Sequence, residues 1–196
     1  MQQSKRPAPQ GSATEQRIAI AKKLLLTPFG LTESHLARAL NEIRAHKVDD
    51  ADLYFQTTRS EGWSLEEGIV KAGSFSIDQG VGIRTVVGDK TAFAYSDNIH
   101  MHALLDAARV TRDIAPVRSS HAKTKGVHVK TSAINATVQA YARDLYVPQD
   151  PIASLSSQDK VALLEKLEQM ARKADPRVTQ VMANMAAEYD VVLVAR

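Results

Sequence analysis

Six histidines are the side chains in this sequence best suited to hold a metal ion or move a proton: His35, His46, His100, His102, His121 and His128. None is followed by glutamate, and no pair has the i, i+4 spacing that sets two imidazoles on one helical face for zinc. His100 and His102 lie two residues apart in an expected helix, where side chains at i and i+2 point in different directions. The pattern therefore favours exposed polar residues over a zinc site.

Other motifs for catalysis or phosphate binding are also missing from the sequence. It contains no cysteine, which excludes a thiolate nucleophile, a thiolate metal ligand and a disulfide. Neither a Gly-x-Ser-x-Gly elbow nor a Gly-x-x-x-x-Gly-Lys phosphate loop occurs. Gly80-Val81-Gly82 lacks the third glycine of a dinucleotide site and precedes a strand, which favours a bulge or tight bend. Glu66 and Glu67 are expected on opposite faces of a strand, where they cannot work as an acid–base pair.

Composition predicts a soluble cytoplasmic protein. The chain has 196 residues and is 44% hydrophobic, enough to bury the core of one domain, or of one domain and part of a second. No run approaches the roughly 18–20 apolar residues of a membrane span. The polar N-terminus lacks the apolar core of a secretory signal.

One stretch departs from the otherwise mixed charge of 25 basic and 22 acidic residues. Residues 114–143 contain no Asp or Glu but carry Arg118, His121, Lys123, Lys125, His128, Lys130 and Arg143. Such a patch could contact nucleic acid or an acidic partner surface. The alternative is a solvated loop, which the lack of aromatic residues between the basic ones favours.

The elements that must position any site form an expected antiparallel meander over residues 51–96. Period-two alternation predicts strands at residues 51–58, 63–71 and 74–79, with Gly62 and Gly73 as their boundaries. Gly88-Asp89 predicts a two-residue hairpin turn between strands at residues 82–87 and 90–96.

Helices are expected on both sides of this meander. The first spans Arg17 to Leu26 and stops at Pro28. Thr32 is the expected N-cap of the second, with Leu31 and Leu36 as a hydrophobic staple. A third helix starts from a cap among Ser96, Asp97 and Asn98 and ends near Ile114, with an apolar stripe of Met101, Leu104, Leu105 and Ala108.

The C-terminal part is expected to hold one helix and two strands. Ser156 and Ser157 are candidate caps of the helix, its buried stripe is Leu164, Leu167 and Ala171, and Asp175-Pro176 ends it. Residues 178–186 alternate, whereas residues 189–195 form an apolar run typical of a strand buried on both faces.

The predicted fold class is α+β, an antiparallel β-meander packed with helices and followed by the start of a second strand-rich region. Residues 1–16 are expected to form a disordered tail and residues 17–116 a helix–meander–helix core. Residues 117–151 are expected to form an irregular basic connection, with possible short strands at 127–129 and 134–138. Residues 152–196 are expected to lead toward a further, catalytic domain.

Three runs resemble a known family: Ala51 to Gln56, Asp78 to Arg84, and Thr91 to Tyr95. They are similar to the N-terminal domain of TldD-type members of the TldD/PmbA metalloprotease family. The likeness extends from about Leu25 to the end of the chain, including Leu145-Tyr146 and the final strand. The fold implied is the N-terminal domain of that family.

The resemblance implies a cytoplasmic zinc peptidase that joins a TldD-like and a PmbA-like (TldE-like) subunit and cleaves peptides or small unfolded proteins. Older labels describe the family as modulators of DNA gyrase. The family's His-Glu-x-x-x-His zinc motif belongs to its C-terminal domain, and neither that motif nor a cysteine ligand occurs here. No catalytic or metal-binding residue is therefore expected in this chain, which is expected to be a truncated piece that is inactive alone. Zinc is implied only for a full-length member.

The expected role of this region is to wall the substrate channel or to contact the partner subunit. The candidate residues for that surface are Asp78, Gln79, Gly80, Gly82, Arg84 and Tyr95. Replacing Arg84 by alanine should then slow cleavage with little loss of thermal stability. Alternatively, the glycines only shape the sheet and Arg84 is a solvated strand residue.

Two other functions stay open. The chain could be a stand-alone module that binds a TldD or PmbA partner without catalysis. It could also be a DNA- or gyrase-associated accessory protein that uses the basic loop, with binding that weakens as salt rises and depends on Lys123, Lys125 and Lys130. No membrane partner is expected, and nucleic acid is the less favoured partner.

Overall fold

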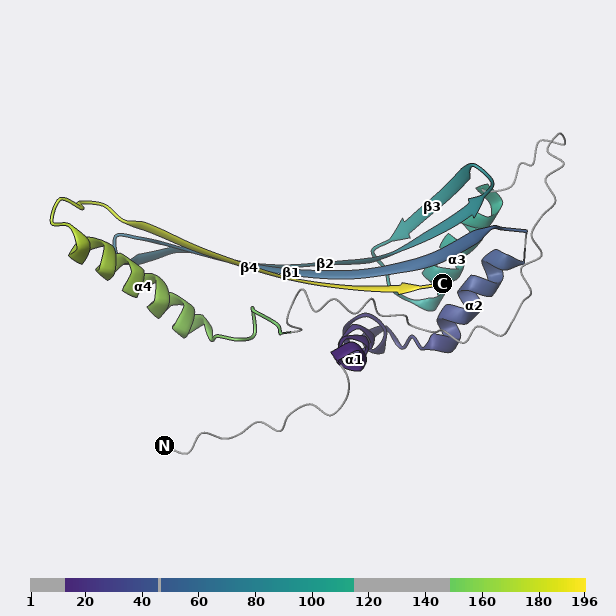
Figure 1. The fold of residues 1–196 in the computed structure, drawn as a ribbon, viewed down its shortest axis with the longest axis horizontal. Coiled ribbons are helices and arrows are strands. Elements are labelled where there is room, and N and C mark those ends of the chain that lie inside the picture. The colour runs from purple at the N-terminus through teal and green to yellow at the C-terminus, as the bar shows by residue number, and fades with distance from the viewer. Residues whose placement is uncertain (1–12, 46, 115–148) are drawn as a thin grey trace, which may run out of the picture. The chain divides into compact units, whose positions relative to one another are not determined.

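The computed structural model describes residues 13–45, 47–114 and 149–196 and has an α+β fold (Figure 1). The helices are α1 (Ala13–Leu25), the short 3-10 turn Thr27–Phe29, α2 (Glu33–Arg44), α3 (Met101–Ile114) and α4 (Ser157–Ala174). The strands are β1 (Asp50–Glu66), β2 (Ile69–Val87), β3 (Lys90–Ser96) and β4 (Met182–Ala195). They form one antiparallel sheet in the order β3-β2-β1-β4. The predicted fold class, an antiparallel meander with helices, is confirmed.

The chain divides into two compact units. Of the described residues, the first comprises 13–45, 47–56, 79–114 and 192–196, and the second comprises 57–78 and 149–191. Strands β1, β2 and β4 each contribute residues to both units. The basic connection and its possible short strands lie almost wholly outside the described residues, as do the first twelve residues. Helix α1 begins at Ala13, earlier than the expected Arg17.

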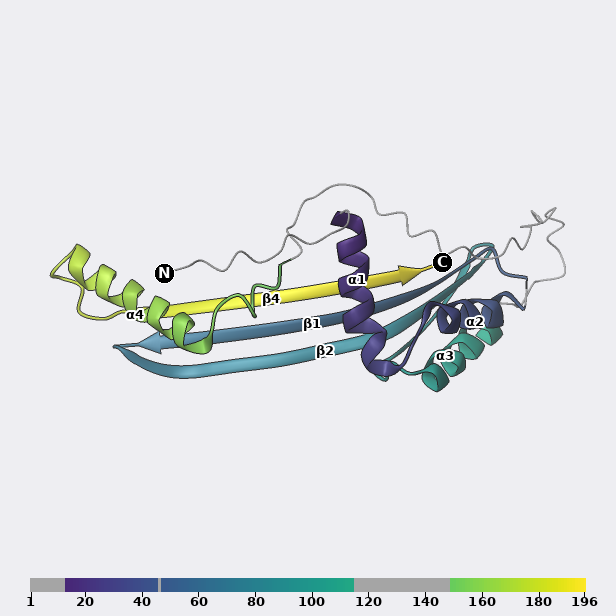
Figure 2. The ribbon, with the colours of Figure 1, turned by 90° about the horizontal axis from the view of Figure 1, so that it is seen from below.

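The core of the first unit forms where α2 and α3 pack against each other and α3 packs on β3. Figures 1 and 2 both show α2 and α3 side by side. Its buried side chains are Leu36, Leu40 and Ile43 of α2, Leu53 and Phe55 of β1, Ile83 of β2, Ala92 of β3, and Leu104 and Ala108 of α3. Removing this apolar surface from water stabilises the unit and fixes which sheet face is covered.

Helices α2 and α3 are both capped at their N-terminal ends. Thr32 caps α2 as expected, and the His35 ring takes the capping-box position that a Glu or Gln usually occupies. The staple residues Leu31 and Leu36 are both buried. The cap of α3 was predicted wrongly: the Ala103 N–H donates to Nδ1 of His100 at 3.1 Å, whereas Ser96 accepts from the Asn98 N–H.

Strands β1 and β2 continue through the glycines that were expected to interrupt them. The turn lies at Glu67 and Gly68, whose φ angles of 53° and 71° suit a tight hairpin connection. Glu67 is therefore a turn residue and not a strand residue. At Gly73 a Cβ would lie 3.0 Å from the Trp63 ring, so this glycine makes room for the indole. Small residues inside a strand can thus report a close cross-strand contact and not a break.

The second hairpin is confirmed. Val87 pairs with Lys90 across Gly88-Asp89, and Gly88 has a φ of 57°. Gly80 and Gly82 lie within the continuous strand β2, where their missing side chains let β3 and its Phe93 ring come close.

In the second unit, α4 starts at the predicted cap, Ser156, which forms a capping box with Asp159. Asp175, in extended conformation before Pro176, ends it as expected. The predicted buried stripe is partly wrong: Leu164 is buried, but Leu167 is exposed, and the other buried positions are Lys160 and Glu168.

The two expected C-terminal strands are one strand, β4. It lies at the edge of the sheet beside β1, and every second residue along it is exposed. Val192 and Val194 are exposed, so the apolar run is not buried on both faces. An apolar run can mark an edge strand as well as a central one.

Two neighbouring glycines of β2 provide a matched test of this close packing. A Cβ at Gly80 would lie 2.9 Å from the Ser96 carbonyl oxygen, which is backbone, whereas one at Gly82 would meet the exposed Phe93 ring at 2.8 Å. Because a ring can rotate and a ladder carbonyl cannot, we expect Gly80→Ala to lower the free energy of unfolding by about 1–3 kcal/mol and Gly82→Ala by less. Urea unfolding of both variants measures the difference, and equal losses would contradict this packing.

Candidate functional site

The first unit places four of the six predicted surface residues on one face of its sheet. Val81, Ile83 and Thr85 of β2 are buried, so the alternate residues Gly80, Gly82 and Arg84 face the other way. On β3, Tyr95 pairs with Gly82 and Phe93 pairs with Arg84, and directly paired residues share a face. We call this surface the outer face; it comprises Asp52, Tyr54, Gly80, Gly82, Arg84, Phe93 and Tyr95.

The other two predicted residues lie apart from this group. Gln79 alternates with Gly80 and so points to the opposite side of β2. Asp78 belongs to the second unit.

Arg84 is held at the centre of the outer face by two carboxylates of β1. Its Nε donates to Oδ2 of Asp52 at 2.8 Å, and its Nη2 donates both to that carboxylate and to Asp50 at 3.1 Å. The Asp52 hydrogen bond and charge raise the pKa of the Arg84 guanidinium, with Asp50 adding to the effect and burial opposing it. Arg84 is therefore a paired, partly exposed side chain, with 35% of its surface accessible.

Aromatic side chains surround this pair on the outer face. Phe93 is 60% exposed and Tyr95 is 80% exposed, whereas Ala92 between the strand and α3 is buried. Because α3 packs closely on β3, only small residues fit beneath it and the large ones must face outward. Tyr54 of β1 is also exposed.

Sequence reasoning missed Asp52, Tyr54 and Phe93 as members of this surface. A signal was present in β3, where alanines at 92 and 94 alternate with aromatics at 93 and 95. Small residues on the covered side and large ones on the open side reverse the usual strand pattern. No local signal connects Asp52 to Arg84, which are 32 residues apart.

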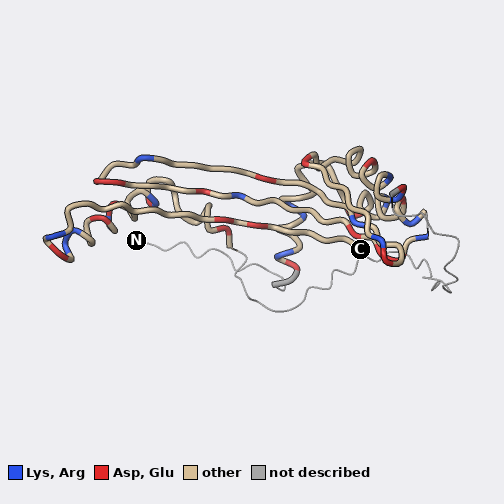
Figure 3. Tube along the Cα trace, turned by 90° about the horizontal axis from the view of Figure 1, so that it is seen from above, with Lys and Arg blue, Asp and Glu red and all other residues tan. Residues whose placement is uncertain are grey.

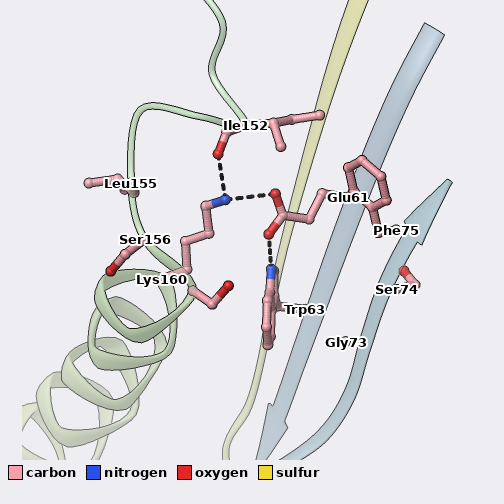
Figure 4. Close-up of a pocket in the computed structure, with 10 residues that line it drawn as sticks. Glu61, Trp63, Gly73, Ser74, Phe75, Ile152, Leu155, Ser156 and Lys160 are labelled. Carbon is pink, nitrogen blue, oxygen red and sulfur yellow. Dashed lines mark hydrogen bonds and ion pairs between the residues drawn. The ribbon is translucent and has the colours of Figure 1, made fainter. Parts of the chain in front are cut away.

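The second unit contains a buried ion pair between α4 and β1 (Figure 4). Nζ of Lys160 donates to Oε2 of Glu61 at 2.6 Å and to the Ile152 carbonyl oxygen at 2.7 Å. Nε1 of Trp63 donates to the other oxygen of Glu61. The hydrogen bond from Lys160 lowers the pKa of the Glu61 carboxyl most, and that from Trp63 acts in the same direction, against the effect of burial.

A hollow of about 490 Å³ opens beside this ion pair (Figure 4). It is lined by Glu61, Trp63, Gly73, Ser74, Phe75, Ile152, Leu155, Ser156, Ser157 and Lys160. All of these residues belong to the second unit. The hollow therefore combines an aromatic wall, serine hydroxyls and a neutralised charge pair.

Further contacts hold the segment before α4 against β1. Asp150 accepts from the guanidinium of Arg59 and from the backbone N–H groups of Ile152 and Ala153. The Arg59 guanidinium also lies over the Tyr189 ring, 5.2 Å from its centre. These contacts fix the wall of the hollow formed by residues 150–156.

Comparison with known families decides the identity. A family model described as PmbA/TldA metallopeptidase domain 1 matches residues 51–115, and one described as the PmbA/TldA metallopeptidase central domain matches residues 150–196. The chain belongs to the TldD/PmbA metallopeptidase family. The resemblance found in the sequence is thereby confirmed.

Curated relatives and solved structures agree with this assignment. The chain is 40% identical over 170 residues to the metalloprotease TldD homolog of Haemophilus influenzae and 33% identical over 177 residues to that of Buchnera aphidicola from Schizaphis graminum. These matches cover 87% and 90% of this chain but only 33% and 34% of those proteins. The chain thus spans about a third of the length of these TldD homologs.

Solved structures share the fold at low sequence identity. A protein named as a modulator of DNA gyrase from Thermotoga maritima has a TM-score of 0.55 and 17% identity, over 83% of this chain and 35% of that one. TldE from Thermococcus kodakarensis has a TM-score of 0.50 and 16% identity, over 83% and 34%. At these identities the likeness concerns the fold alone.

The described residues of this TldD/PmbA chain contain no group of three or more His, Cys, Asp or Glu side chains placed to hold a metal ion. His35 and His100 serve as helix caps, and Nδ1 of His102 lies 2.8 Å from Asp106. The remaining histidines, His46, His121 and His128, lie outside the described residues. The donors of the described residues do not fit a zinc ion, so no metal-dependent step is assigned to these residues.

Charge over the described residues is mixed. Figure 3 shows lysines and arginines interspersed with acidic residues along the helices and strands. The basic stretch that motivated a nucleic-acid interface falls almost wholly outside the part of the chain that the structure describes, so that interface stays a prediction. Within that part, no helix is both long and apolar enough to cross a membrane.

The Arg84–Asp52 pair gives a prediction that corrects the one made from sequence. The Asp52 side chain is only 10% exposed, so Arg84→Ala leaves a buried carboxylate without its main partner. We expect a loss of about 2–3 kcal/mol in the free energy of unfolding, not the small change expected earlier. In an Asp52→Asn background the same substitution should cost less, as a double-mutant cycle in urea would measure. Equal costs in both backgrounds would argue against the pair.

The Lys160–Glu61 pair predicts a pH dependence of stability. The folded pKa of Glu61 lies below its ordinary value of 4.5, so its contribution is complete above that value and is lost as the pH falls through the lowered folded value. We expect Glu61→Gln to lose about 3–5 kcal/mol near neutral pH, because Lys160 is left buried without its counter-ion.

This difference from the unsubstituted chain should shrink as the pH is lowered below 4.5 and through the lowered folded pKa of Glu61. Urea unfolding across that range measures it, with Glu165→Gln on an exposed position of α4 as the control. A difference that stays constant with pH would contradict the assigned role of the Glu61 carboxylate.

Proposed function

We propose that this chain forms a non-catalytic wall of a TldD-like zinc metallopeptidase. The observation that supports this most directly is the outer face, where Phe93 and Tyr95 stand exposed around the neutralised Arg84–Asp52 pair. In the complete protein this surface would line the path of unfolded peptide substrates or contact a TldE-like partner subunit. Hydrolysis would be carried out by residues elsewhere in that protein, which would bind the zinc ion.

The chemistry of the outer face supports such a contact. Exposed aromatic rings contribute large apolar area at low cost in side-chain entropy, and they are enriched in protein interfaces, whose centres are depleted of free charge. The charge of Arg84 is compensated by two carboxylates, so Arg84 does not place a free charge on this surface. The rings also stand on paired strands, which fixes the backbone that carries them.

Family membership supports the link to peptide hydrolysis. Both matching models carry the description of a metallopeptidase, and the curated relatives are named metalloproteases. Since this chain spans about a third of their length, the proposal assigns peptide hydrolysis to a longer protein that would contain it.

A partner of similar fold suits this surface. TldE from Thermococcus kodakarensis shares the fold, and two different chains of one fold can pack against each other about a pseudo-two-fold axis. A TldE-like subunit is therefore the partner proposed for the outer face if it does not line the peptide path.

A chimeric enzyme tests the proposal. This chain would replace the matching third of the Haemophilus influenzae TldD homolog, and cleavage of an unstructured peptide would be measured with its TldE-like partner and zinc present. We expect Tyr95→Ala with Phe93→Ala to lower kcat/KM by about tenfold or more, while the exposed Leu167→Ala of α4 leaves it unchanged.

Association with the partner, measured by analytical ultracentrifugation, separates the two roles. Slower cleavage with intact association assigns the outer face to the peptide path, and lost association assigns it to the subunit interface. If both cleavage and association are unchanged, the outer face has neither role. Stoichiometric zinc binding and cleavage by this chain alone would overturn the non-catalytic assignment.

A further inference from the structure

One face of helix α4 lies against the hairpin that β1 and β2 form in the second unit. Figures 1 and 2 both show α4 beside the hairpin end of these strands. Positions 160, 164, 168 and 172 recur every four residues, which places them on one side of a helix. Lys160, Leu164 and Glu168 are buried there, and Arg172 is bonded to the hairpin. Three of these four side chains are charged, so the contact depends on ion pairs more than on apolar area.

Two ion pairs fasten this face at two points. Nζ of Lys160 lies 2.6 Å from Oε2 of Glu61 in β1, and Nη2 of Arg172 lies 2.6 Å from Oε2 of Glu67 in the turn. Arg172 also donates to Glu168 of its own helix. The two cations are separated by about 18 Å along the helix and the two hairpin carboxylates by about 20 Å along the extended chain. Because these spacings match, both pairs form at once when α4 lies along β1.

Protonation of Glu61 would leave Lys160 in an unfavourable position. The Glu61 carboxylate is faced by the Lys160 ammonium and by the Trp63 N–H, and the ammonium donates otherwise to the Ile152 carbonyl oxygen. The Lys160 side chain is only 7% exposed and stays protonated in acid. A buried ammonium group without its counter-ion is strongly destabilised, and movement of α4 into water would hydrate it. Loss of the Glu61 charge therefore favours departure of the helix.

The second ion pair weakens in the same direction. The Glu67 carboxylate accepts from the Val181 N–H and from Arg172, and Lys71 adds a further positive charge. The hydrogen bond from Val181 lowers the pKa of Glu67 most, and the pKa of Glu61 is lowered as well. Both carboxylates thus keep their charge above the ordinary value of 4.5 and lose it as the pH falls through their lowered folded values.

A third carboxylate ties down the segment that leads into α4. Asp150 accepts from Arg59 of β1, whose guanidinium lies over the Tyr189 ring of β4. Protonation of Asp150 would weaken this contact also. The helix and the segment before it are therefore both held to β1 through carboxylates.

Little else would hold α4 once these pairs are lost. Leu164 is the one hydrophobic side chain that the helix buries. By contrast, β4 is joined to β1 within the sheet, whose main-chain hydrogen bonds do not titrate. The first unit has its own apolar core between α2, α3 and the sheet. Acid should therefore act on the helix before it acts on the rest of the fold.

We propose that α4 is an acid-released cover of the β1–β2 hairpin: when the hairpin carboxylates take up protons, the helix leaves the hairpin while the sheet and the first unit stay folded. Release removes the wall of the hollow that Leu155 and Lys160 provide and uncovers Trp63. This switch is independent of the peptidase role and of the outer face, because it concerns the second unit alone.

The test follows the full 196-residue chain as the pH is lowered from about 7 to about 3. Trp63 is the only tryptophan, so its fluorescence reports on this site, and its emission should move to longer wavelength below pH 4.5 as the indole meets water. Hydrogen exchange, corrected for the effect of pH on unprotected amides, should show about tenfold or greater loss of protection in α4. Helices α2 and α3 should keep their protection at the same pH.

A double variant and a matched control separate this switch from a general effect of acid. Glu61→Gln with Lys160→Met removes the titrating pair without leaving a buried charge, so α4 should stay protected at the pH that releases half of the unsubstituted helix. Glu165→Gln with Lys166→Met makes the same two changes at exposed positions of α4 and should release the helix at the unchanged pH.

Three results would overturn the proposal. The first is an α4 that stays protected until the first unit unfolds, and the second is loss of protection in α2, α3 and α4 together. Both need only the unsubstituted chain, so they decide the matter even if the double variant fails to fold by circular dichroism at neutral pH. The third is release of the folded double variant at the same pH as the control.

Discussion

The arrangement of the second unit depends on the buried ion pair between Lys160 and Glu61. A buried ammonium group must keep its counter-ion, so α4 is held with Lys160 facing β1. This orientation also buries Glu168, which accepts from Arg172 at 3.0 Å. As a consequence, the apolar side chains at Leu163, Leu167 and Met170 point to solvent. The buried side of this helix thus combines one apolar side chain, Leu164, with the charged Lys160 and Glu168.

The second unit has little apolar core. Among its described residues, the buried hydrophobic side chains are Leu65, Ile152 and Leu164. Ion pairs and hydrogen bonds between strand, segment and helix supply much of what holds it together, and each is costly to break when buried. The hollow beside Trp63 lies in this sparsely packed unit.

The first unit is organised by close helix packing instead. Helix α3 packs so closely on β3 that only Ala92 and other small side chains fit beneath it. The aromatic side chains of β3 therefore lie on the outer face. On that face Arg84 joins β2 to β1 through hydrogen bonds to Asp52 and Asp50, beside the exposed rings. The two units are therefore held together in different ways, one by close apolar packing and the other largely by ion pairs.

The sequence by itself determined the α+β class, the Gly88-Asp89 hairpin, the Thr32 and Ser156 caps and the family, because each depends on local patterns of turn, cap and alternation. It also identified Gly82, Arg84 and Tyr95 as candidate surface residues, but only through the resemblance to the family. Tertiary structure decided the rest. Gly73, which was expected to end a strand, makes room for Trp63, and the helix stripe was misplaced because Lys160 meets Glu61, 99 residues away. Contacts between residues so distant in sequence leave no periodic signal, so only the folded chain reveals them.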